Sequence, residues 1–420
     1  MTSDISALGA IIGLLFSVFL IFKKVTPVYS LISGAIFGGL VGGASLTRTV
    51  EIMIVGVQGI SPAILRILAA GVLAGVLIES GSTIVIAERI IKQHGESKAL
   101  LALSIAAMIL TASGVFLDVV IITISPIALS IAQKAGFSRS AILLAMMGGA
   151  KAGNIISPNP NSIAIAEAFD IPLSQVMLGG IIPALFGLAA TYFMAKRTFK
   201  SGSYLKTVSV KEVERVELSF IKAMSPAGIA IFLLMLRPLA GIEIDPIIAL
   251  PLGGVIGCLM IGGHQKIIPY SEKGLLKMSD VALILLGTGT LAGIVSHSGI
   301  GEMLIQGIEY IGLPVYMLAP ISGILMGAAT ASTTSGSAIA GSVFSDTIVN
   351  SGISAVGGAV MIHTGATVID MLPHGSIFHA SSGPIEMTFK ERLRLIPYEA
   401  TIAMVTVVVA TLIYGLLKIM

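Results

Sequence analysis

The stretch GNIISPNPNS, residues 153–162, interrupts a long apolar segment of the chain. Apolar sequence lies on both sides, AILLAMMGGA before it and IAIAEAFDI after it. Pro158 and Pro160 each lack an amide proton, and each disfavours helix in the residue before it. The segment therefore predicts a helix over residues 140–169 that is broken near its middle.

The composition is that of a membrane protein. Hydrophobic residues make up 55% of the 420 residues and charged residues 11%, whereas a soluble domain carries about 25% charged residues. Apolar runs close to the length of a membrane-spanning helix recur along the whole chain. We therefore predict an all-α polytopic membrane protein that contacts the lipid bilayer directly.

The distribution of charge predicts an orientation. Twenty of the 25 basic residues fall on one side of the predicted spans, together with the polar segment 196–221. Acidic residues such as Asp170, Glu243 and Asp245 fall on the other side. Because cytoplasmic loops are enriched in Lys and Arg, we expect 196–221 to be a cytoplasmic linker and both termini to lie outside.

Short stretches of the chain recur in the same order. LAGVLIESG (73–81) resembles LAGIVSHSG (291–299), GGLVGG (38–43) resembles GGVIGC (253–258), and NPNS (159–162) falls opposite LPHG (372–375). We expect two inverted repeats, residues 1–195 and 222–420, each with about five transmembrane helices, one of them broken, and one re-entrant hairpin. Inverted repeats with matched breaks are typical of secondary transporters.

Two segments are too short for a pair of complete spans. Arms of about 15 residues reach roughly 22 Å, less than a hydrocarbon core of about 30 Å. We predict a hairpin from the inside at 99–133, with TASGVFLD (111–118) at its tip, and one from the outside at 314–346, with TASTTSGSA (330–338) at its tip. Two complete helices whose hydroxyls bond their own backbones remain the alternative.

The second half repeats the helix break at GATVIDMLPHGSIFHA (365–380), within a broken helix predicted over 354–382. Non-helical backbone at membrane depth lines a cavity or lies inside protein. The half-helix after each break presents free N–H groups that suit a carboxylate. A proline kink in a packed helix is the alternative. The predicted substrate-binding residues are Ser113, Asn154, Ser157, Asn159, Asn161, Ser332, Thr333, Thr334, Ser335 and His374.

Ionisable residues within the predicted spans are candidates for proton coupling. Asp118 lies at the first hairpin tip, and Asp370 lies at the second break, four residues before His374. Burial can raise a carboxyl pKa and His titrates near neutrality, so any of the three could carry a proton. A structural, self-neutralising pair is the alternative. Lys151 is a possible charge partner of Asp118 or Asp370, or a contact for a substrate carboxylate.

Several classes of protein are excluded by what the sequence lacks. Cys258 is the single cysteine, so neither an intrachain disulfide nor a cysteine metal site is possible. HExxH, GxSxG and Walker A sequences are absent. We therefore expect no metal, cofactor or nucleic-acid partner, no enzymatic activity, and no ATP-driven pumping by this chain.

The motifs SPNPNS, DMLPHGS, FLDV (116–119) and LAGVLIESG together resemble the gluconate permease family, gluconate:proton symporters of the ion transporter superfamily. The resemblance covers nearly the whole chain. It implies proton-coupled uptake of gluconate or a related small hydroxy acid across a bacterial inner membrane, in which the protein would reside. The superfamily implies an elevator-like motion in a homodimer, whose surface by analogy is formed by helices at 5–22, 28–47, 222–238 and 247–263.

One motif departs from the family pattern. Gluconate permeases tend to carry a Pro-Pro-His-Pro-Gly type sequence at the first break, where this chain has SPNPNS. Asparagines replace the histidine and the following glycine, which leaves the substrate and the coupling ion open. The oxygen-rich segments SPNPNS and TASTTSG also allow a Na⁺-coupled carboxylate transporter of the same fold. A passive anion channel is a third possibility.

Overall fold

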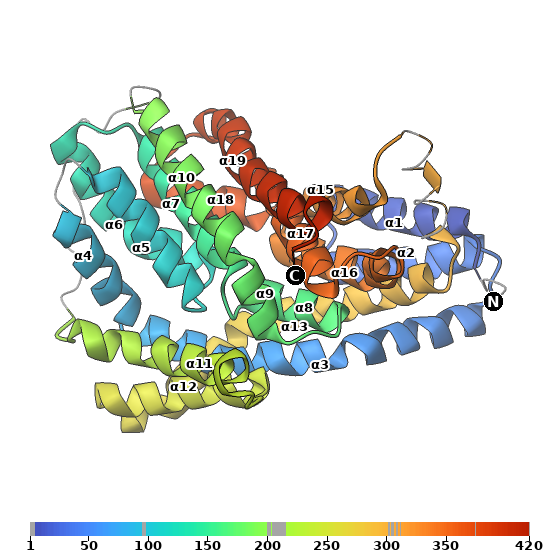
Figure 1. The fold of residues 1–420 in the computed structure, drawn as a ribbon, viewed down its shortest axis with the longest axis horizontal. Helices are drawn as coiled ribbons and strands as arrows, with labels where there is room; N and C mark the ends of the chain where they lie inside the picture. The colour runs from blue at the N-terminus through green and yellow to red at the C-terminus, as the bar shows by residue number, and fades with distance from the viewer. Residues whose placement is uncertain are drawn as a thin grey trace.

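A computed structural model describes residues 5–94, 98–199, 203, 216–300, 303, 306–307, 310, 312–373 and 375–419. Within these residues the fold consists of helices and their connections (Figure 1). Six helices are long and apolar enough to cross a membrane, or seven if the bent pair α9 (Leu173–Gly179) and α10 (Ile181–Arg197) forms one span. The predicted all-α membrane fold is confirmed. Most of the predicted linker 196–221 lies outside the described residues.

The helices follow one another in a similar order in both halves. The first half also contains α1 (Ala7–Phe22), α2 (Pro27–Val41), α3 (Leu46–Glu79), α4 (Ser82–His94), α5 (Ala99–Ala112), α6 (Leu117–Ala135), α7 (Arg139–Ile155) and α8 (Pro160–Ala168). The second half contains α11 (Phe220–Ala240), α12 (Pro246–Ile261), α13 (Ile267–Ser296), α15 (Leu318–Thr330), α16 (Thr333–Asn350), α17 (Ala355–Ala366), α18 (Ser376–Ser382) and α19 (Phe389–Ala410), which continues into a π-helical turn, Thr411–Leu416.

The two longest helices, α3 and α13, run side by side in opposite directions along the molecule (Figure 1). Glycines bring their backbones into contact. A Cβ atom on Gly56 would overlap the carbonyl of Gly289, and one on Gly274 would overlap the carbonyl of Gly71. Small residues at a contact allow membrane helices to approach this closely. The α3–α13 pair therefore forms a frame on which α2, α8, α11, α12 and α16 pack.

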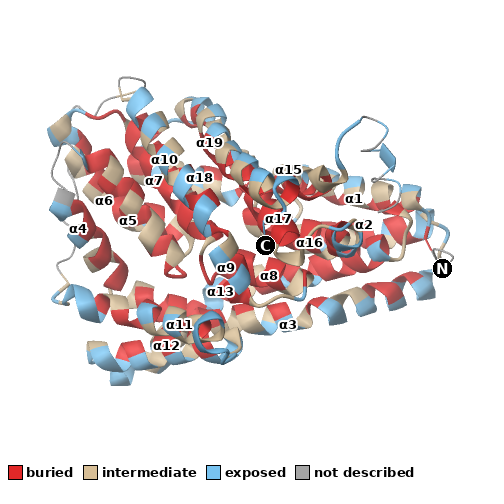
Figure 2. Ribbon diagram, in the orientation of Figure 1, coloured by how far each residue is buried: buried red, intermediate tan, exposed pale blue. Residues whose placement is uncertain are grey.

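Outer helices carry the apolar surface. In Figure 2 the helices α1, α3, α11 and α12 show exposed faces. Large exposed apolar side chains include Leu8, Phe19, Tyr29, Ile221 and Leu239, which suits contact with lipid. The helix expected over 28–47 ends earlier, at Val41, because Gly43 adopts a positive φ of 98° and Ser45 then caps the start of α3.

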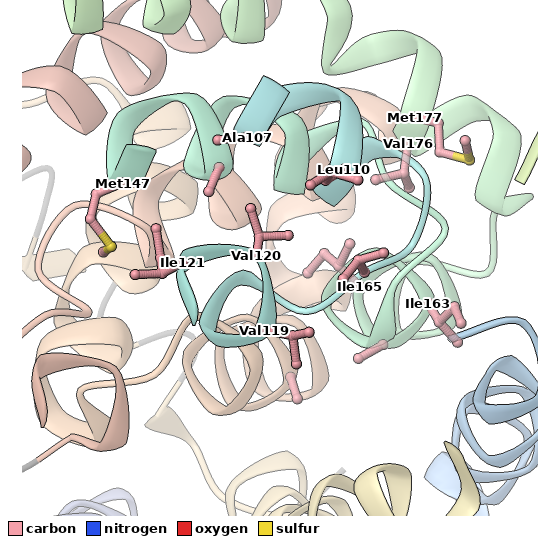
Figure 3. Packing of buried hydrophobic residues seen from close by; sticks show 14 of the residues in the cluster. Ala107, Leu110, Val119, Val120, Ile121, Met147, Ile163, Ile165, Val176 and Met177 are labelled. Atoms are coloured by element: carbon pink, nitrogen blue, oxygen red, sulfur yellow. The ribbon is translucent and has the colours of Figure 1, made fainter. Parts of the chain in front are cut away.

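The helices around the first break are buried. Every residue of α7 from Ser140 to Ile155 is buried, as Figure 2 shows in red. The Thr111 hydroxyl of α5 donates to the Ala150 carbonyl of α7 at 2.9 Å. Figure 3 shows buried apolar side chains of this region, which come from five helices, namely Ala107, Leu110, Val119, Val120, Ile121, Met147, Ile163, Ile165, Val176 and Met177.

The described residues include two ionic clusters, of which the first joins segments that are distant in the sequence. Arg66 of α3 binds Glu167 of α8 and binds Asp245, the N-cap of α12, at 2.7 Å. Burial raises the pKa of Asp245, but bonds from Arg66 and the Ile247 amide, with the Arg66 charge, outweigh it and hold that pKa below its ordinary value. The first cluster therefore connects the frame to the half-helix that follows the first break.

The second cluster lies within the membrane-spanning helix α19. Arg392 is fully buried and binds Glu399, which lies two turns further along α19. It also donates to the Ser381 hydroxyl at 3.0 Å. Its guanidinium carbon lies 5.3 Å from the centre of the Phe378 ring. Arg392 is one of the twenty basic residues that the sequence places on the cytoplasmic side of the predicted spans. Its burial shows that this end of α19 is packed against α18.

Widening the α3–α13 contact should destabilise the fold. We predict that Gly274→Val lowers the free energy of unfolding by about 1–3 kcal/mol, because the new side chain meets backbone rather than a side chain that can move. Gly228→Val on α11 is the matched control, since nothing lies within 4 Å of a Cβ at that position. Circular dichroism melting of both variants in detergent measures the difference, and equal melting temperatures would contradict the close contact.

Breaking the Arg392–Glu399 pair should be costly. Arg392→Met leaves the Glu399 carboxylate buried without its partner, which typically costs about 3–5 kcal/mol. The double variant Arg392→Met/Glu399→Met removes both charges and should regain most of this loss. The same melting experiment tests the pair, and a double variant as unstable as the single one would argue against an uncompensated charge as the cause.

Candidate functional site

A cavity of about 140 Å³ lies where both helix breaks and both short helical hairpins meet. We call it the tip cavity. Its lining residues are Phe116, Leu117, Asp118, Asn154, Asn159, Pro160, Asn161, Ala331, Ser332, Thr333, Thr334, Asp370, Ser376 and Ile377. They come from both halves of the chain and from segments more than 200 positions apart.

Three helices begin at this cavity. Phe116, Asn159 and Ser332 are the N-caps of α6, α8 and α16, and the first residues of each helix also line the cavity. Helix N-termini carry unpaired N–H groups and a partial positive charge. Ser376 and Ile377, which open the short helix α18, complete the lining. The positive ends of these helices favour an anionic group, and the carboxyl groups of Asp118 and Asp370 line the same cavity.

The first helix break follows from its local sequence. Helix α7 ends at Ile155, and α8 begins with Pro160, whose fixed φ suits the first helical position. The Asn159 side chain caps α8 by accepting from the amides of Asn161 at 3.0 Å and Ser162 at 3.1 Å. Its amide nitrogen also donates to Asn154. The break is therefore held by its own asparagines.

The α15–α16 turn is hydrogen-bonded to both breaks. It is tight because Ala331, which ends α15, has a φ of +46°. On the far side of the turn, the Thr334 hydroxyl donates to Asn161 at the first break. The Thr333 hydroxyl donates to Asp370 at the second break, at 2.5 Å. These two bonds bring the polar groups of both halves to one place.

Lys151 forms a buried ion pair with Asp370. Its Nζ atom lies 2.5 Å from Asp370 Oδ1 and 2.7 Å from the carbonyl oxygen of Thr367. The side chains are only 3% and 5% exposed. Of the two partners that the sequence left open for Lys151, Asp370 is the one that it contacts. Asp118 lies across the same cavity without a hydrogen-bond or ion-pair partner in the described part of the chain.

Some of the predicted site residues lie near the cavity without lining it. Ser113 and Ser157 are buried, and their hydroxyls donate to the carbonyls of Leu110 at 2.7 Å and Thr111 at 2.5 Å. The Ser335 amide donates to Ser332. Lys151 is buried against Asp370 and is not among the lining residues. His374 lies outside the described residues.

The other predicted residues line the tip cavity together, namely Asn154, Asn159, Asn161, Ser332, Thr333, Thr334, Asp118 and Asp370. Sequence reasoning missed Ser376 and the apolar lining residues Phe116 and Leu117. Ser376 could have been found, because it is the first residue of the half-helix that follows LPHG. The apolar residues flank Asp118 in FLDV and carried no polar signal.

A larger cavity, of about 300 Å³, surrounds the Arg66 cluster. Both of its arginines are neutralised, Arg66 by Glu167 and Asp245 and Arg237 by Glu243 at 2.5 Å. Asp170 adds a further negative charge. This Arg66 cavity therefore suits an anion less well than the smaller tip cavity, despite its size.

Comparisons with known proteins agree with this architecture. Residues 5–253 match the family model described as GntP family permease, and residues 223–311 match one described as Na⁺-H⁺ antiporter family. The crystal structure of the Alcanivorax borkumensis YdaH transporter superposes with a TM-score of 0.68 at 16% identity, covering 88% of this chain and 89% of that one.

Relatives in sequence are transporters. An uncharacterized transporter of Haemophilus influenzae is 56% identical over 99% of this chain and 100% of its own length. The gluconate permease of Pseudomonas aeruginosa is 24% identical, covering 80% of this chain and 81% of that protein. The low-affinity gluconate transporter of Escherichia coli K12 is 22% identical, covering 79% and 80%.

These matches confirm the resemblance seen in the sequence motifs. The chain is a transporter rather than an enzyme, and it is a multi-pass protein of the inner membrane. The family model spans more than half of the 420 residues, and the Haemophilus relative extends the match to the whole chain. The chain belongs to the GntP family of permeases.

Proposed function

We propose that this permease is a secondary active transporter that imports a small organic anion, gluconate or a related hydroxy acid, by proton symport. The observation that carries the proposal is the meeting of three helix N-termini at the tip cavity. The positive ends of all three helices and the first amides of α6 and α16 suit a carboxylate, whereas the amides of α8 are already bonded to Asn159. The side chains of Asn154, Asn161 and Thr334 suit the hydroxyl groups of a sugar acid. Two relatives are named for gluconate.

The contacts favour Asp118 as the proton carrier among the three candidates. Asp370 is neutralised by Lys151, whereas the Asp118 carboxylate lines the cavity without such a partner among the residues that the structure describes. A substrate anion placed beside an ionised Asp118 would repel it, so the substrate and a proton on Asp118 favour each other's binding. This reciprocity is the requirement for symport. His374 stays a candidate from the sequence alone.

An elevator-type motion of inverted repeats fits the packing of α3 and α13. Three glycines of α3 have a glycine 218 positions later in α13, namely Gly56 with Gly274, Gly71 with Gly289 and Gly75 with Gly293. The contact of Gly56 with Gly289 repeats as the contact of Gly274 with Gly71. Repeats related by a twofold axis would produce this reciprocity, which supports residues 1–195 and 222–420 as the two repeats.

The proposed moving part comprises both hairpins and both breaks. The arms α5 and α15 have 14 and 13 residues, which is about 20 Å of helix and short of a complete span. Their partner arms α6 and α16 have 19 and 18 residues, and α6 is long enough to cross a membrane. The short arms α5 and α15 therefore carry the support for re-entrant hairpins at 99–133 and 314–346. The outer helices α1, α2, α11 and α12 would then form the scaffold and, in a homodimer, the contact between protomers.

Na⁺ coupling is the second candidate, suggested by the match of residues 223–311 to an antiporter family. None of the residues that line the tip cavity falls within that range.

Uptake of labelled gluconate into proteoliposomes distinguishes the candidates. We expect accumulation with an inward proton gradient alone. Accumulation only with a Na⁺ gradient would identify Na⁺ as the coupling ion. Flux without accumulation would indicate a passive channel.

The bond between the two halves should matter for substrate affinity. Thr334→Val removes the hydroxyl that binds Asn161, so we expect a loss of about 1 kcal/mol, or about five-fold in the half-saturation concentration for gluconate exchange. Thr401→Val is the control, because that exposed hydroxyl bonds its own helix at Pro397. An unchanged half-saturation concentration for Thr334→Val would show that Thr334 does not contribute to the substrate site.

Neutralising Asp118 should separate exchange from accumulation. We expect Asp118→Asn to exchange labelled gluconate across the membrane but not to accumulate it under an imposed pH gradient, since the variant has no proton to release. Asp346→Asn, at an exposed position of α16, should retain both activities. Full gradient-driven accumulation by Asp118→Asn would show that another group carries the proton.

A further inference from the structure

The second helix break holds an ammonium group where a transporter could hold a metal cation. The Nζ atom of Lys151 is contacted by a carboxylate oxygen of Asp370 at 2.5 Å and by the backbone carbonyl of Thr367 at 2.7 Å. The other carboxylate oxygen of Asp370 accepts from Thr333 at 2.5 Å. Carboxylate and unwound backbone carbonyl oxygens are the groups that coordinate Na⁺ at broken helices.

The Lys151 side chain is placed for this contact by the packing of α7. Lys151 lies in a helix buried from Ser140 to Ile155, so its ammonium group has no water to solvate it. Asp370 is equally buried at 4% exposure. A buried charge requires a partner. Lys151 and Asp370 come from different halves of the chain, so their bond also joins the two breaks.

We propose that Lys151 is a tethered cation, which occupies a monovalent-cation site formed by Asp370 and the Thr367 carbonyl and thereby makes the permease independent of Na⁺. This proposal deepens the proposed function, because it assigns the residue that sets the ion specificity. Lys151 acts as a positioning residue: it holds Asp370, which in turn holds Thr333 at the tip cavity. Substrate contact is not required of it.

Removal of the Lys151 side chain should leave the proposed cation site free to bind a cation from solution. Lys151→Ala leaves the carboxylate and carbonyl oxygens in place, and it leaves room for a small cation. The variant should melt several degrees below the wild type in N-methylglucamine chloride, because a buried carboxylate has lost its partner. Na⁺ or methylammonium should restore the melting temperature in a saturable manner at constant ionic strength.

Two controls separate a filled site from a general salt effect. Lys151→Ala/Asp370→Asn lacks the carboxylate, so Na⁺ should not change its melting temperature. Lys92→Ala removes a lysine whose side chain is 73% exposed and should behave as the wild type does. Rescue of the single variant but of neither control would support the site, and equal responses of all the variants would overturn it.

The wild-type protein gives a second test, which does not depend on whether Lys151→Ala folds. Its melting temperature should be the same in NaCl, KCl and N-methylglucamine chloride at one ionic strength. A saturable stabilisation by Na⁺ alone would overturn the proposal. These measurements need no substrate, so they stand even if gluconate is not transported, and a failure of gluconate uptake would bear on the proposed function alone.

Discussion

The structure depends on a constraint set by the membrane: backbone N–H and C=O groups have no water to bond there, so each one needs a partner in the protein. Both helix breaks free such groups. At the first break Asn159 caps the amides of Asn161 and Ser162, and Ser157 bonds the carbonyl of Thr111. At the second, Lys151 bonds the carbonyl of Thr367. The polar side chains at the breaks therefore make the breaks possible.

The breaks also lie against the α15–α16 turn. Side-chain hydrogen bonds join them, from Thr334 to Asn161 and from Thr333 to Asp370. The amides at the start of α8 are already bonded to Asn159, whereas the first amides of α6 and α16, at Leu117 and Thr333, have no hydrogen-bond partner among the described residues and lie at the cavity. A bound carboxylate would satisfy them, so structural need and proposed function meet at the same atoms.

Features governed by local chemistry could be predicted from the sequence. Pro158 and Pro160 located the first break, and Asn159 beside Pro160 is an ordinary helix cap. The partner of Lys151 could not be chosen, because Asp118 and Asp370 become distinguishable only when the rotation of α7 against its neighbours is known. The burial of Arg392 could not be predicted for a similar reason. Its partner Glu399 lies two turns along the same helix, but its burial depends on how α18 packs against α19. Ser113 and Ser157 were chosen by residue type, but their hydroxyls bond backbone carbonyls.

The central claim is that an anion binds at the tip cavity, and locating the bound molecule tests it most directly. A cryo-EM map of the protein in nanodiscs with gluconate should show ligand density between the N-termini of α8 and α16, within hydrogen-bonding distance of Asn161 and Thr334. A matched map without gluconate should lack it. Ligand density in the Arg66 cavity, with the tip cavity unchanged between the two maps, would contradict the account.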